Sequence, residues 1–316
     1  MPPEVETITT ADLLGHVVAW QFPSNQIAYS DVRKALESAG LNPEYAKELR
    51  PAAAFSRAAK GLKEQRRIDK VKSEKGITRF QLTHVKNDGE QIDFTRETEV
   101  KLESETGIIT CPNAAIEQQA RDLFRDAMAT RTNNDCTRLV QELFKQNADL
   151  FPLVPEKGVA YFVPVAHSAF LAKVRNFAEA CGGSFYPFPV PKGTAIGNAS
   201  VRDTVASGLA NMISELNAAV SDWDDTTRAS TTDKAIKRWE QITYKTEAYA
   251  VYLETEKDKL TEALAAAKEA LTAKILAVET AKEEKKAAKE ATEQTLLESA
   301  DSGELAPWEA GELAAV

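Results

Sequence analysis

Apolar and polar positions alternate in short stretches in the first third of the chain. Residues 79–83 and 91–95 each place an apolar residue at every second position, and the alternation returns at 100–102. Asp88-Gly89, between the first two stretches, is typical of a hairpin turn. We therefore expect an antiparallel meander with one face packed on flanking helices and one face in water. Its apolar face is expected to hold Phe80, Leu82, Ile92, Phe94, Val100 and Leu102.

Short helix patterns precede the meander. An apolar stretch at 16–22 predicts a strand, and helical spacing of apolar residues follows at 30–39, 42–50 and 52–62. Proline begins the second of these helices and ends it, because proline fits a first helical turn but interrupts a helix interior. Short helices followed by a twisted hairpin favour a winged-helix-like arrangement.

The middle of the chain mixes helices and strands. Residues 112–148 contain two amphipathic helix patterns. Prolines in the later of two strand patterns confine that strand to a sheet edge. The elements expected after residue 148 are a strand at 159–163, a helix at 168–180, a strand at 184–190 and a helix at about 200–220.

The last third of the chain has the composition of a long helix. Residues 232–297 contain no glycine or proline and are rich in Ala, Glu, Lys and Leu, which favour helix. One continuous helix and a helical hairpin that breaks near 257–259 both fit. Leucines at seven-residue spacing predict a coiled-coil contact between copies of the chain. The residues expected in that contact are Leu253, Leu260, Leu264, Leu271 and Val278.

These patterns predict an α+β protein in four segments. Residues 1–111 form a helix-plus-meander module, 112–221 a central α/β segment and 222–298 a long helical or coiled-coil region. Residues 299–316 form a flexible acidic tail. Trp308 in that tail offers a large anchor for docking to another protein, although a tail without a partner fits equally well.

Composition limits the classes of function. The 316 residues are 43% hydrophobic and 28% charged, with apolar runs far shorter than the roughly 20 residues of a membrane span. No signal-peptide pattern opens the chain, so we expect a cytoplasmic protein without membrane contact. Cys111, Cys136 and Cys181 are widely spaced, and the three histidines are scattered. Since no catalytic or metal-binding constellation results, we expect neither an enzyme nor a cofactor.

One segment inverts the charge of the whole chain. Residues 47–86 carry twelve lysines or arginines and four acids, a net charge of +8 in a chain of −9. A localised positive surface requires an anionic partner or an acidic neighbour. We therefore expect nucleic acid to bind this surface through its phosphates, with the C-terminal helices joining copies into a homo-oligomer. The expected contacts are Arg57, Lys60, Lys63, Arg66, Arg67, Lys70, Lys72 and Lys75.

A second interpretation assigns the same surface to self-assembly. From Lys245 onward the chain has nine lysines and sixteen acids, a net charge of −7. In a structural or scaffold protein, the basic surface of one copy would dock on the acidic helices of the next. An active site assembled by folding is a third interpretation. The sequence does not distinguish DNA from RNA.

Overall fold

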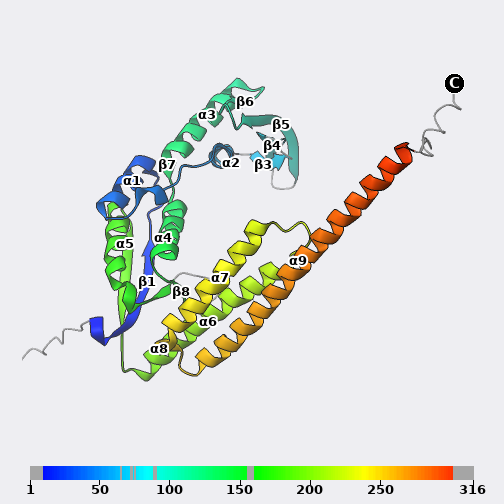
Figure 1. Ribbon diagram of the computed structural model, residues 1–316. Coiled ribbons are helices and arrows are strands. Elements are labelled where there is room, and N and C mark those ends of the chain that lie inside the picture. The colour runs from blue at the N-terminus through cyan, green and yellow to red at the C-terminus, as the bar shows by residue number, and fades with distance from the viewer. Residues whose placement is uncertain are drawn as a thin grey trace, which may run out of the picture. The chain divides into compact units, whose positions relative to one another are not determined.

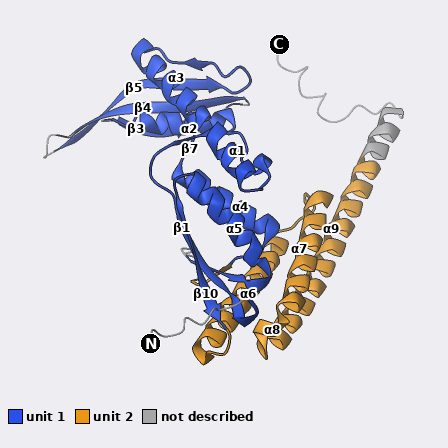
Figure 2. Cartoon of the chain, turned by 90° about the vertical axis from the view of Figure 1, so that its left-hand side faces the viewer, with its two compact units in different colours: residues 1–150, 159–191 blue, residues 151–158, 192–316 orange. Residues whose placement is uncertain are grey.

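The α+β class predicted from the sequence is confirmed. The computed structural model describes residues 10–64, 66–71, 74, 76–87, 91–154 and 160–301. Contacts group the chain into two compact units, residues 1–150 with 159–191 and residues 151–158 with 192–316 (Figure 2). The first unit mixes helices and antiparallel strands, and the second is helical apart from one short strand. In this described part of the chain, no helix is both long and apolar enough to cross a bilayer.

One core of the first unit is built on a long central strand, β1 (Leu13–Gln21) (Figure 1). β1 pairs antiparallel with β10 (Ser184–Pro191) on one side and with β9 (Tyr161–Pro164) on the other. β10 lies at the edge of the sheet, as its prolines predict, because proline cannot donate a backbone hydrogen bond to a further strand.

Three helices bury their apolar faces in this core. Trp20 of the central strand stacks on Phe144 with ring centroids 6.0 Å apart, and Phe144 is fully buried. The helices are α1 (Tyr29–Ser38), α4 (Asn133–Asn147) and α5 (Ser168–Ala180). The short elements beside them are η1 (Thr10–Asp12), β2 (Ile27–Ala28), η2 (Pro43–Tyr45), β7 (Thr130–Arg131) and η3 (Val165–His167).

A second core of the first unit lies between a four-stranded sheet and two helices. The strands run in the order β3-β4-β5-β6, each antiparallel to its neighbour. Phe55 packs edge-on against Phe80 with ring centroids 5.5 Å apart, which joins a helix to the sheet. The expected winged-helix arrangement is not confirmed. The elements are α2 (Pro51–Gly61), β3 (Arg66–Val71), β4 (Ile77–Asn87), β5 (Ile92–Glu103), β6 (Ile109–Thr110) and α3 (Ala114–Ala129).

The structure corrects the predicted apolar face of the meander. Residues 100–102 belong to β5 and not to a separate strand. Ile92 and Phe94 of the same strand are 55% and 59% exposed. The register between β4 and β5 shifts at Glu97. Leu82 of β4 pairs with Thr98 and the next residue, Thr83, pairs with Arg96, so Glu97 is left without a partner on β4. A one-residue shift turns the following side chains to the other face of the sheet. The predicted turn at 88–89 lies outside the described residues.

The second unit is a bundle of three helices with two short elements. Of the two predicted alternatives, a continuous helix and a helical hairpin, the structure has the hairpin. The long helix is interrupted at residues 249–255 and not near 257–259. Glu254 there has a φ of 47°, which ends the preceding helix. Figure 1 shows the last helix continuing past the other two. The elements are β8 (Phe151–Pro152), α6 (Ala195–Ser221), α7 (Ala229–Ala248), α8 (Ala250–Leu253) and α9 (Glu256–Asp301).

Candidate functional site

Within the basic segment, ion pairs with carboxylates of the same chain are made by Arg57, Arg66, Arg67 and Arg79. Arg66 on β3 donates two hydrogen bonds to Glu97 on β5, at 2.6 and 2.9 Å. Arg67 lies 2.9 Å from a carboxylate oxygen of Asp69. Both arginines were expected to bind nucleic acid, and in the structure each of them pairs with a carboxylate. The pairing of Arg66 depends on the sheet. Glu97 is 31 residues away in sequence, and only the folding of β3, β4 and β5 into one sheet brings it beside Arg66.

Arg57 is also paired, and its partner organises the start of α4. Its guanidinium donates to both carboxylate oxygens of Asp135, at 2.7 and 2.5 Å. Asp135 also accepts from the backbone N–H of Thr132 at 2.9 Å and completes a capping box with that residue. Burial raises the pKa of Asp135, but the hydrogen bonds from Arg57 and Thr132 outweigh burial, so its pKa is lower than usual. The Asp135 carboxylate is therefore fully engaged.

The lysines of the segment differ from its arginines. Lys60, Lys63 and Lys70 are exposed, and in the described part of the chain none of the three forms an ion pair. Lys63 follows the last turn of α2, and its carbonyl accepts the backbone N–H of Arg66 at 3.0 Å. Lys70 pairs in register with Phe80, whose ring packs on α2. Because directly paired residues of neighbouring strands point to the same face of a sheet, the Lys70 side chain lies on the face that the helix covers. The predicted contacts Lys72 and Lys75 lie outside the described residues.

An open hollow is lined by residues of α2, α3 and α4. It measures about 480 Å³, and its charged lining is Arg57, Lys60, Asp126, Asp135 and Arg138. Arg138 is exposed and, among the described residues, has no carboxylate partner. Arg57 and Lys60 lie three residues apart and so share one face of α2. We call Lys60, Lys63, Lys70 and Arg138 the cationic track.

Sequence reasoning missed Arg138. Arg138 lies in a helix of mixed charge, outside the basic segment, and only tertiary packing places it beside the basic residues of α2. No local pattern identifies such a residue. The one available signal was weak, since Arg138 follows Asp135 by three residues and therefore shares its face of α4.

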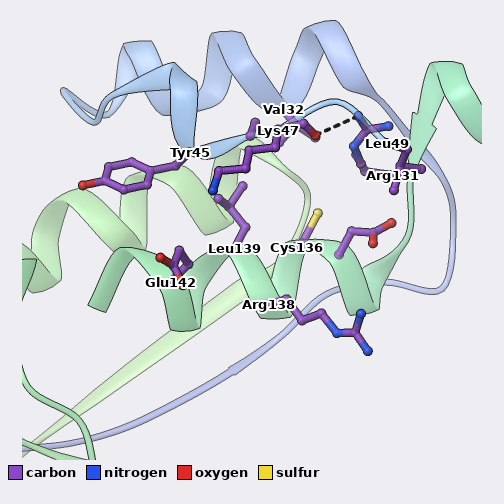
Figure 3. Close-up of a pocket in the computed structure, with 11 residues that line it drawn as sticks. Val32, Tyr45, Lys47, Leu49, Arg131, Cys136, Arg138, Leu139 and Glu142 are labelled. Carbon is purple, nitrogen blue, oxygen red and sulfur yellow. Dashed lines mark hydrogen bonds between the residues drawn. The ribbon is translucent and has the colours of Figure 1, made fainter. Parts of the chain in front are cut away.

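A cavity of about 320 Å³ lies beside the same stretch of α4, and Asp135 and Arg138 line both this cavity and the hollow (Figure 3). Arg131 beside it is 5% exposed and lies 4.1 Å from the ring centre of Tyr29. Its guanidinium donates to the carbonyl of Lys47 at 3.1 Å, the contact drawn in Figure 3, and to two further carbonyls. Burial lowers the pKa of Arg131. Carbonyl acceptors thus stabilise this cation, and its role is to join the segment around Lys47 to the start of α4.

The residues predicted to join copies of the chain lie inside the second unit. Their side chains are between 0% and 6% exposed and pack within the bundle of α6, α7 and α9. A helix from another copy could therefore reach them only if the bundle opened. They are Leu253, Leu260, Leu264, Leu271 and Val278. Trp308, the predicted docking residue, lies outside the described residues.

No metal centre forms in the part of the chain that the structure describes, because no group of three or more His, Cys, Asp or Glu residues converges there. Comparison with curated proteins and with solved structures finds no match. Residues 13–289 match the model of one protein family, which is described as a family of unknown function. The match includes both units and every residue of the cationic track.

Proposed function

The chain belongs to this family, DUF6744, and we propose that it is a non-enzymatic nucleic-acid-binding protein whose phosphate contacts are made by the cationic track. One observation carries the proposal. Among the described residues, the exposed cations Lys60, Lys63, Lys70 and Arg138 form no ion pair, and Lys60 and Arg138 line the same open hollow. Phosphate binding requires several accessible cations along a surface and no further chemistry.

The pairing of the arginines narrows the proposed interface. Arg57 donates hydrogen bonds to both carboxylate oxygens of Asp135. That carboxylate therefore does not compete with a phosphate group for Lys60 or Arg138, which line the same hollow. Asp126 remains as an acid in the lining. Because most of the contacts are lysines, which bind phosphate as point charges, the track supports affinity without sequence readout.

Charge reversal tests this proposal. In the variant with Lys60→Glu, Lys63→Glu and Arg138→Glu, we expect affinity for labelled DNA or RNA to fall at least about 100-fold at 0.1 M salt. The reason is that each neutralised phosphate contributes about an eightfold factor at that salt concentration. Fluorescence anisotropy with single-stranded and duplex probes of equal length measures the loss and identifies the preferred form.

A matched control comes from the second unit. Arg228, Lys234 and Lys237 are exposed and carry no ion pair within the described ranges. Their reversal to glutamate makes the same change in net charge, and we expect a much smaller loss of affinity. Equal losses in the two variants would assign binding to net charge and remove the track from the proposal. Self-assembly would be favoured instead if the wild-type protein does not bind nucleic acid but forms large species, detected by light scattering, that dissociate at high salt.

A further inference from the structure

Two buried cysteines from different helices touch inside the first unit. Cys136 lies in the second turn of α4, and Cys181 directly follows the end of α5. Both are free thiols in the main core, 1% and 4% exposed, and a hydrogen bond joins their side chains. The sequence separates them by 45 positions, so only folding brings them together. A disulfide needs sulfurs about 2.05 Å apart, which only cysteines already in contact reach without backbone movement.

The cavity beside α4 gives one of these thiols a route to small molecules. Cys136 lines this cavity of about 320 Å³. Figure 3 shows its sulfur directed from α4 into the space between that helix and the segment that carries Lys47. A water molecule needs about 30 Å³ of liquid volume, so the cavity accommodates an oxidant of similar size. Cys181 does not line it.

We propose that Cys136 and Cys181 are a peroxide-reactive thiol pair that closes to a disulfide in the folded protein. The two positions suit different roles. Cys136 lies near a helix N-terminus, which favours a thiolate, and Cys181 lies at a helix C-terminus, which disfavours one. Cys136 is therefore the attacking sulfur, and Cys181 is the sulfur that resolves the first product.

The hydrogen bond between the thiols strengthens this difference. The bond from Cys181 lowers the pKa of Cys136, against the opposing effects of burial and of the negative charge of Asp135, and the positive charge of Arg131 adds to the lowering. The same hydrogen bond and burial both raise the pKa of Cys181. Of the two thiols, Cys136 therefore loses its proton more readily, which makes it the nucleophile.

The chemistry balances with hydrogen peroxide as a two-electron oxidant. The Cys136 thiolate attacks one peroxide oxygen, the O–O bond breaks, hydroxide leaves, and a sulfenic acid remains on Cys136. The Cys181 sulfur then attacks the Cys136 sulfur. The S–O bond breaks, and the departing hydroxide takes the Cys181 thiol proton and leaves as water. In total, two thiols and one peroxide give one disulfide and two waters.

Mass spectrometry of the intact, native chain tests the proposal. After treatment with dilute hydrogen peroxide, we expect the mass to fall by two hydrogen atoms and a non-reduced digest to contain a peptide that links Cys136 to Cys181. Cys181→Ala should instead accumulate a sulfenic acid on Cys136, trapped by a dimedone-type reagent. Cys136→Ala should leave Cys181 unmodified.

Cys111 supplies the control. It is only partly buried, and its sulfur contacts the hydroxyl of Thr98 at 3.4 Å. Cys111→Ala should form the link between Cys136 and Cys181 at the wild-type rate. Wild-type protein that keeps its native circular dichroism under peroxide but forms no such link would overturn the proposal. So would a link that forms only after urea is added, because the folded pair would then play no part.

Discussion

Replacing Asp135 with alanine is expected to lower the free energy of unfolding of the first unit by about 3 kcal/mol. The change leaves the Arg57 guanidinium, whose side chain is 31% exposed, without its carboxylate partner. It also removes the capping box at the start of α4, whose loss alone costs about 1 kcal/mol. Removing one member of a partly buried pair costs more than the pair itself contributes, because the remaining charge stays desolvated.

Hydrogen exchange measured by mass spectrometry locates this effect. In Asp135→Ala, we expect the amides of α4 to exchange faster, together with those of α2 around Arg57. Asp31→Ala is the matched control, since Asp31 also lies in the first turn of a helix and pairs with a lysine, Lys34, at 3.6 Å. The side chain of Asp31, however, is 62% exposed. Exposed pairs contribute about 0–1 kcal/mol, so its exchange should change little. Equal effects in the two variants would show that Asp135 has no special role.

Gly15→Ala is expected to disrupt the sheet around β1, at a cost of about 3 kcal/mol or more. A Cβ atom at this position would lie 2.2 Å from the carbonyl oxygen of Val163 and 2.7 Å from the ring of Phe162. The first of these atoms belongs to the backbone of β9, which pairs with β1 in register. Rotating a side chain would therefore not relieve this clash, and β1 and β9 would have to separate.

Gly40→Ala separates this steric effect from the general cost of replacing glycine. Gly40 has a φ of 67° and nothing within 4 Å of an added Cβ atom. Its substitution should cost only the left-handed backbone penalty of about 1–2 kcal/mol. Urea unfolding followed by far-ultraviolet circular dichroism compares the two variants. A Gly15→Ala midpoint equal to or above that of Gly40→Ala would contradict the packing argument.

Local patterns predicted much of the fold. Alternation at 79–83 identified part of β4, the prolines placed β10 at an edge, and the helix-rich composition after residue 232 identified a helical region. The register shift at Glu97 was not predictable, because pairing between strands causes it and periodicity within one strand does not reveal it. The buried leucines of α9 show the same limit, since their spacing fits a partner helix from the same chain as well as one from another.

The candidate site was predictable only in part. Net charge along 47–86 identified the segment that carries Lys60, Lys63 and Lys70, which are exposed in the structure. It did not reveal that Arg57 pairs with Asp135, a partner 78 residues away. Arg138 and the contact between Cys136 and Cys181 likewise arise from tertiary packing. Charge counting therefore finds a basic region but cannot say which of its cations folding leaves unpaired.

The salt dependence of binding tests the central proposal most directly. With duplex DNA, the slope of log affinity against log salt concentration reports about 0.9 for each phosphate that the protein neutralises. The neutral variant with Lys60→Gln, Lys63→Gln and Arg138→Gln should lower the magnitude of the wild-type slope by about 3. A slope identical to that of the wild type, or no wild-type binding at low salt, would contradict the assignment of these cations to phosphate contacts.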